Sequence, residues 1–202
     1  MHKVFTSYHH AKDQYYKDWL VRMGENYEIF IDRSVDTGDI SDNLTDQAIR
    51  EKIRDDYLRD STVTIVLVGE ETKRREHVDW EIYSSMIDGR VNKKSGILTV
   101  SLPSIETSSS IYVSHSGEKK AVYPDIHVWQ TLTSRTEFES YYPYMPDRII
   151  DNLLEQEAKV SVTAWSRIEN NPKNLQFLID AAFEDRAKCK YDLRRPMRRN
   201  NS

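Results

Sequence analysis

The sequence predicts one α/β domain built as three layers, in which a five-stranded, mainly parallel sheet lies between helices on both faces. Two observations support this fold class. Short apolar segments alternate with helical segments along the first half of the chain, and the segment at residues 62–68 shows little polar alternation. Strands that are apolar on both sides are typical of a parallel sheet that is covered by helices on both faces.

The expected strands are short and rich in β-branched residues. Their alternation with helices favours right-handed βαβ units, and the strand order 2-1-3-4-5 of a flavodoxin-like fold is expected. The five segments are residues 3–7, 27–31, 62–68, 96–100 and 159–165.

Apolar residues at helical spacing predict the helices between these strands. In the second helix, for example, Leu44, Ile49 and Ile53 fall on one stripe. The last helix is expected to begin at Asn171-Pro172, where proline is tolerated in the first turn. The remaining helices are expected at residues 11–23, 42–58, 76–88 and 147–157.

One domain is expected to span residues 1–193, with an elaborated C-terminal half and an inserted loop or hairpin at about residues 101–130. Residues 111–113 and 121–123 flank a polar stretch there, and this pattern predicts a hairpin. Residues 194–202 form a basic tail, for which a solvated tail is favoured over a phosphate or partner contact.

The composition excludes several classes of protein. The net charge of −4 argues against a general nucleic-acid binder. The single cysteine, Cys189, excludes both a disulfide within the chain and a cysteine-rich zinc site. The longest apolar run, at residues 65–68, is too short to cross a bilayer, and no leader pattern precedes it. A cytoplasmic protein without a membrane partner is expected.

The candidate site is selected by a rule for open parallel sheets, which bind ligands beyond the carboxyl ends of their strands. Polar segments follow the first three predicted strands at residues 7–10, 32–39 and 69–72, and the helix that carries Glu81 comes next. Tyr8 and His9 lie in the first of these segments and Asp36 in the second. These side chains are therefore candidates for substrate binding.

Familiar alternatives lack their motifs. The sequence has no glycine-rich nucleotide loop, no nucleophile elbow, and Val68-Gly69 where a phospho-receiver carries aspartate. His9 and His10 lack a matching cluster of ligands, and the spacing of Asp32 and Asp36 does not continue into a calcium loop. No metal site and no cofactor are therefore predicted.

The motifs at residues 3–8, 30–38 and 72–82 resemble those of the TIR-like domain family that includes the ThsB component of Thoeris antiphage defence. Residues 3–8 resemble its first strand, and residues 30–38 its second strand and the loop that follows. Thr72, Arg75 and the segment 77–82 resemble the family signature Thr-x-x-Arg-x-x-Val-x-x-Glu-Ile. The resemblance spans roughly residues 3–100, with weaker matches near residues 145–153 and 172–182, and it implies a TIR-like version of the predicted fold.

The resemblance implies that NAD⁺ is a substrate and that Glu81 is the catalytic carboxylate. Periodicity alone would make Glu81 an ordinary helix glutamate. Trp80 beside it is an equal candidate for packing and for stacking on the substrate. The family further implies an NAD⁺ glycohydrolase or ADP-ribosyl cyclase, whose ADP-ribose-derived signal activates a separate effector protein after a phage-derived trigger.

Two other functions stay open on the sequence. One is a non-catalytic TIR-like module that acts through protein contacts, because fold does not fix function. The other is a nucleotide-binding sensor without turnover. The sequence also leaves open the product, the trigger and whether the protein assembles into a homo-oligomer.

Overall fold

The computed structural model describes residues 1–34, 44–89, 92–107 and 110–199, and its centre is a five-stranded sheet. The order β2-β1-β3-β4-β5 and the parallel pairing of all neighbours confirm the predicted fold class. The strands are β1 (His2–Ser7), β2 (Phe30–Asp32), β3 (Val63–Val68), β4 (Gly96–Ser101) and β5 (Ser161–Ala164). Because they all run the same way, their carboxyl ends lie along one edge of the sheet.

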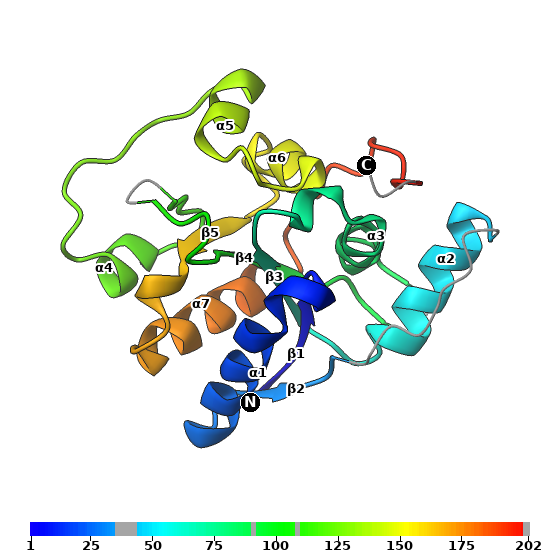
Figure 1. Cartoon of the computed structure of the whole chain (residues 1–202), viewed down its shortest axis with the longest axis horizontal. Coiled ribbons are helices and arrows are strands. Elements are labelled where there is room, and N and C mark those ends of the chain that lie inside the picture. Colours follow the sequence, from blue (N-terminus) through cyan, green and yellow to red (C-terminus); the bar gives the residue numbers. More distant parts are fainter. Residues whose placement is uncertain (35–43, 90–91, 108–109, 200–202) are drawn as a thin grey trace.

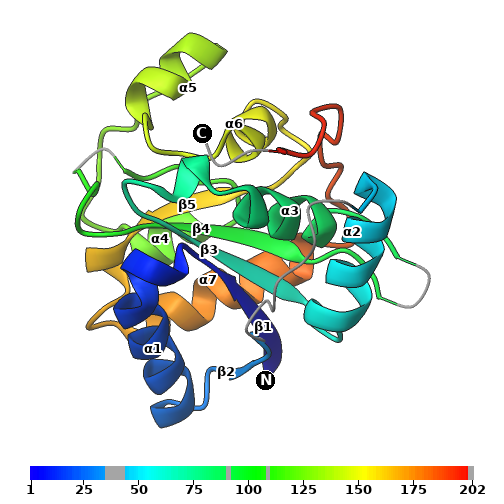
Figure 2. The same cartoon turned by 45° about the vertical axis from the view of Figure 1, so that its right-hand side comes forward.

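Helices cover both faces of this sheet (Figures 1 and 2). Ile65 and Leu67 of β3 share one hydrophobic core with α1 (His10–Asn26), α4 (Glu118–Val122) and α7 (Pro172–Asp185). Val66 and Val68, which point to the opposite face, share a second core with the other helices. These are α3 (Glu76–Ser85), α5 (Arg135–Tyr141) and α6 (Asp147–Leu153).

A third, smaller core lies at the β1 side of the sheet. It joins Phe5 of β1 to Ile49 of α2 (Asp46–Lys52) and to Ile53, where a π-helix (Ile53–Tyr57) continues α2. The predicted helix at residues 42–58 is therefore two elements, and residues 35–43 lie outside the described part of the chain. Two 3-10 turns complete the elements, at Thr72–Arg74 and Trp165–Arg167.

The second strand begins later than the sequence predicts. Residues 27 and 28 form a turn, in which Tyr27 is 60% exposed and Glu28 has a φ of 52°. The strand starts late because α1 extends to Asn26. After the turn, the Phe30 ring packs so closely on Gly24 of α1 that a Cβ on Gly24 would lie 2.6 Å from it. The prediction of a strand from residue 27 was therefore wrong at its start.

The predicted hairpin at residues 111–123 is wrong. Residues 118–122 form the helix α4, and Tyr112 instead makes an isolated antiparallel bridge to Val162 of β5. Val122 and Tyr123 are buried in the core with α7, and the Tyr123 hydroxyl donates to Thr163 at 2.8 Å. The apolar residues of this segment are therefore used against α7 and β5 rather than against each other.

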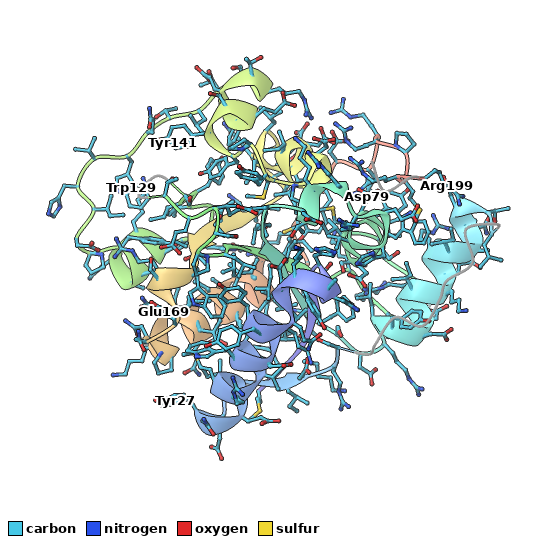
Figure 3. All side chains as sticks on the ribbon, in the orientation of Figure 1. Tyr27, Asp79, Trp129, Tyr141, Glu169 and Arg199 are labelled. Carbon is cyan, nitrogen blue, oxygen red and sulfur yellow. The ribbon has the colours of Figure 1, made fainter. Side chains whose placement is uncertain are left out.

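The basic tail also differs from the prediction, because its described part is packed rather than solvated. The Arg148 guanidinium of α6 donates to the carbonyl oxygens of Arg195 and Pro196 at 3.0 and 3.1 Å. Met197 is 5% exposed in the core with α2. Arg199 donates to the Leu44 carbonyl oxygen at 3.0 Å, and Figure 3 shows it beside α2. The tail thus crosses the outward side of α3.

No helix in the described ranges has the length and apolar character that crossing a membrane requires.

Candidate active site

A buried serine–glutamate pair lies where the carboxyl end of β1 meets α3. Ser7, the last residue of β1, is 0% exposed, and Glu81 of α3 is 1% exposed. The Ser7 hydroxyl donates to Glu81 Oε2 at 2.6 Å, while Glu81 Oε1 has no hydrogen-bond partner among the described residues. A buried carboxyl oxygen without a partner costs folding free energy. The Ser7–Glu81 pair is therefore the leading candidate for a functional site.

Helix α3 is held in this position by its apolar face and by the turn that precedes it. Its apolar residues Val78 and Ile82 pack into the core with β3 and β4, as their spacing predicts. Before the helix, the Gly69 amide donates to Thr72 Oγ1 at 2.9 Å, which ties the end of β3 to the 3-10 turn. This geometry turns Glu81 toward β1 and buries it more deeply than the sequence predicts.

Burial changes the protonation of Glu81. It raises the pKa of the carboxyl to about 8, and the hydrogen bond from Ser7 opposes only part of that rise. At neutral pH the protonated form therefore dominates in the free protein. A positively charged ligand beside the carboxyl would lower this pKa again and favour the ionised form.

Three aromatic rings, those of Tyr8, His10 and His77, contact one another just after the end of β1. The Tyr8 ring stacks on His10 at 4.4 Å between centroids, and His10 meets His77 edge to face at 5.5 Å. His77 lies one helical turn before Glu81, so both side chains are on the same side of α3. Burial lowers the pKa of His77 to about 4, which makes its ring neutral at pH 7.

His9 lies in the same loop and is 7% exposed. Burial, and then the nearby Arg75, lowers the pKa of its ring. Its Nδ1 atom is 3.9 Å from Glu71 and has no hydrogen-bond partner among the described residues. Tyr8 and His9, which the sequence selects for substrate binding, thus lie on the segment that follows Ser7 directly.

Trp80 and Asp36 have different outcomes. The Trp80 indole is 2% exposed in the core with Phe5 and Met197, and its Nε1 donates to the Arg198 carbonyl oxygen at 2.6 Å. The structure thus gives Trp80 the packing position of the two that the sequence allowed. Asp36 lies outside the described residues.

The loop that contains Asp36 begins beside the end of β1. The Thr6 amide donates to Ser34 Oγ at 2.9 Å, and Ser34 in turn donates from its amide and hydroxyl to Asp32 Oδ1. Lys17 of α1 pairs with Asp32 at 3.1 Å. The carboxyl ends of β1 and β2 are therefore joined by side chains next to Ser7.

Sequence reasoning selected Glu81 but missed Ser7, which donates to it, and His77, which lies one helical turn before it on α3. Ser7 ends a predicted strand, and His77 precedes Glu81 by four residues, so both carried a usable signal. Neither residue type points to a carboxylate partner without the fold. Within the described ranges, no group of three or more His, Cys, Asp or Glu residues is arranged to hold a metal ion.

Comparison with known families gives one match. A family model described as the TIR-like domain of the Thoeris protein ThsB matches residues 5–107, just over half of the chain. That range includes Ser7, Thr72, His77 and Glu81. No curated protein and no solved structure matches the chain.

Proposed function

Because this chain belongs to the TIR-like domain family of the Thoeris protein ThsB, we propose that it cleaves the nicotinamide–ribose bond of NAD⁺. Glu81 is the carboxylate of this reaction. The observation that carries the proposal is its position: a buried carboxyl, 2.6 Å from the Ser7 hydroxyl, at the carboxyl edge of the sheet. That edge is where open parallel sheets bind ligands.

The chemistry fits one carboxylate. The C–N bond between ribose and nicotinamide breaks with both electrons going to the ring nitrogen, so nicotinamide leaves as a neutral molecule without a proton from an acid. The ribose passes through an oxocarbenium-like state, as in glycoside hydrolysis. An ionised Glu81 would stabilise that positive charge at short range.

Protonation of Glu81 links substrate binding to this step. In the free protein, burial raises the pKa of Glu81 to about 8, which favours the neutral form. The nicotinamide ring of NAD⁺ is positively charged, so its arrival lowers that pKa and releases the proton. Ser7 donates to Oε2 in either form and fixes the direction of the carboxyl.

The acceptor of the ribose decides the product. Water gives ADP-ribose, an internal hydroxyl or ring nitrogen gives a cyclic isomer, and an external nucleophile gives a conjugate. In this proposal the product is a signal for a separate effector protein in antiphage defence, released after a phage-derived trigger. Tyr8 and His9 line the substrate beside Ser7, with Asp36 in the neighbouring loop.

The test follows nicotinamide release from NAD⁺ with lysate of infected cells as the source of the trigger. Wild-type protein is expected to release nicotinamide, and Glu81→Gln to release at least about a hundredfold less, the size of effect seen when one transition-state contact is lost. Glu25→Gln, at an exposed position on α1, is the matched control and should keep the wild-type rate. Equal release by wild type and Glu81→Gln would refute the catalytic role.

The 1% exposure of Glu81 favours a second candidate, a non-catalytic module that acts through protein contacts. In that case the Ser7–Glu81 pair is an internal structural hydrogen bond. Absence of nicotinamide release from every variant, together with defence in cells that survives the Glu81→Gln change, would select this candidate.

A further inference from the structure

A pocket lies between α2, the π-helix that continues it, and the residues that follow α3. Its volume is about 490 Å³, within the ~300–1,000 Å³ that is usual for pockets of small ligands. The π-helix precedes β3 and residues 87–89 precede β4, so the pocket lies toward the amino ends of these strands, away from the Ser7–Glu81 pair. Among the described residues, the lining consists of Gln47, Arg50, Glu51, Arg54, Asp55, Ile87, Asp88 and Gly89.

Arg54 lines this pocket with two of its three guanidinium nitrogens unpartnered. The side chain is 3% exposed, and neither Nη1 nor Nη2 has a hydrogen-bond partner among the described residues. Burial lowers the pKa of the guanidinium to about 10, so it stays charged at neutral pH. A buried charged group whose donors are unused costs folding free energy and calls for an explanation.

The aliphatic part of Arg54 is held in place, in contrast to its outer nitrogens. Arg54 Nε donates to the Asn92 carbonyl oxygen at 3.4 Å, and the Asn92 amide donates to the Arg54 carbonyl oxygen at 3.5 Å. Gly89 packs so closely on this side chain that a Cβ there would lie 3.2 Å from Arg54 Cγ. The π-helix that carries Arg54 is a rare form that often marks functional sites. The two Nη groups are therefore the part of Arg54 that is left for a ligand.

Carboxylates in the same lining decide the charge of that ligand. Asp88 and Asp55 lie near enough to Arg54 to oppose part of the fall in its pKa, yet neither hydrogen-bonds its Nη atoms. Together with Glu51, three carboxylates line the pocket against two arginines. An anion would therefore meet repulsion there, whereas an uncharged ligand with acceptors on one edge and donors on another would use both kinds of group.

We propose that this pocket binds a guanine base. Guanine presents two neighbouring acceptors, O6 and N7, and an arginine pairs with both at once. Its N1–H and N2 amine groups are donors that a carboxylate accepts. Adenine has an amine donor in place of O6, so it would oppose the donors of Arg54. Because guanine is uncharged, the excess of carboxylates does not repel it.

Binding would give the unpartnered guanidinium its missing bonds. With the aliphatic part of Arg54 held by Gly89 and Asn92, the guanidinium only needs to tilt into the pocket as the base enters. Ile87 is the apolar side chain of the lining and offers a surface for the flat face of the ring. The site does not depend on any reaction at the Ser7–Glu81 pair.

The experiment is calorimetric titration of the full chain with guanosine, and saturable binding at one site is expected. Adenosine and cytidine should each bind at least about tenfold more weakly, the discrimination that one bidentate arginine–base pair provides. Adenosine fails at Arg54, and cytidine has a single amine where guanine has two donor groups.

Variants of Arg54 test the arginine directly. Arg54→Met keeps the length of the side chain without its donors, and Arg54→Lys keeps the charge without the flat pair of nitrogens. Both should weaken guanosine binding at least about tenfold. Arg22→Met, at an exposed position on α1 outside the pocket, is the matched control and should bind like the wild type. Replacement of an unpartnered buried charge by methionine should not lower the thermal midpoint, which separates a binding defect from a folding defect.

Inosine, which lacks the N2 amine of guanosine, tests the carboxylates. Wild-type protein should prefer guanosine to inosine at least about threefold, the effect of one hydrogen bond. Asp55→Asn or Asp88→Asn should remove this preference, depending on which carboxylate accepts the amine.

Three results would overturn the proposal: no saturable binding of guanosine, equal affinities for guanosine and adenosine, or wild-type affinity in Arg54→Met. Glu81→Gln should bind guanosine like the wild type, so this test is independent of whether the protein cleaves NAD⁺.

Discussion

Two buried carboxylates on opposite sides of α3, Asp79 and Glu81, differ in how completely they are hydrogen-bonded. On the tail side, Asp79 accepts two hydrogen bonds from the Arg148 guanidinium and one from the Arg198 amide. Arg148 also donates to carbonyl oxygens of the tail. On the β1 side, Glu81 has one hydroxyl donor and one oxygen without a partner among the described residues. Asp79 therefore has the bonds of a structural carboxylate, whereas Glu81 keeps an oxygen without a partner, a feature that in proteins calls for an explanation.

The largest expected effect is the pH dependence that Glu81 alone imposes on stability. Its pKa is about 8 in the folded protein, whereas the ordinary value for a glutamate, which we take for the unfolded chain, is 4.5. Between these values the unfolded chain has lost the proton and the folded protein still holds it, so stability falls as pH rises and levels off above pH 8. The loss is about 5 kcal/mol, at ~1.4 kcal/mol per pKa unit.

The measurement compares urea unfolding of wild type and Glu81→Gln from pH 4 to pH 9. The difference between the two free energies should change in this window, with the variant gaining on the wild type toward high pH. A constant difference would show that Glu81 does not titrate as a buried group and would remove the contrast between the two sides of α3.

The second largest expected effect is the loss of stability when the Arg148–Asp79 pair is broken. Arg148→Ala leaves Asp79 buried without its arginine and frees the tail carbonyls, which should lower the free energy of unfolding by ~3–5 kcal/mol. Chemical denaturation measures it. Arg194→Ala, at a tail side chain that is 82% exposed, is the control and should leave the midpoint unchanged. Similar midpoints for both variants would contradict a role of Arg148 in stabilising Asp79 and the tail.

Ser7→Ala tests the contribution of the single hydrogen bond that Glu81 receives. Removal of the hydroxyl leaves both oxygens of Glu81 without a donor, which raises the pKa of Glu81 above its wild-type value and costs ~1–3 kcal/mol. In the same pH series, the step due to Glu81 should move to higher pH. Ser34→Ala, which removes a hydroxyl that contacts β1 but not Glu81, should leave that step in place.

The smallest effect is expected at the outer end of the tail. Arg199→Ala removes an exposed ion pair with Asp46 and one bond to the Leu44 carbonyl oxygen, where the side chains are 37% and 52% exposed. Exposed ion pairs contribute ~0–1 kcal/mol. A loss as large as that of Arg148→Ala, measured by the same denaturation, would mean that the tail is held from its end rather than at α3.

Local patterns determined most of the fold. β-branched runs specify β3 and β4, the stripe on α7 specifies its buried face, and Asn171-Pro172 marks its start. The predictions were wrong where a segment has no pattern of its own. Residues 121–123 were predicted as a strand of a hairpin, yet Ala121 and Val122 lie in the helix α4, because Val122 and Tyr123 are buried against α7 and β5.

The sequence by itself determined the parallel sheet and the position of Glu81 on the helix after β3, because these depend on periodicity and on the alternation of strands and helices along the chain. Only the tertiary structure decided which side chains meet. Ser7 reaches Glu81 across 74 residues, Arg148 reaches Asp79 across 69, and the Arg198 amide reaches Asp79 across 119. A serine, an arginine or a basic tail carries no local mark of its partner, since that partner is set by the packing of helices against one sheet. That packing gave Asp79 hydrogen bonds on both oxygens and left Glu81 Oε1 without a partner among the described residues.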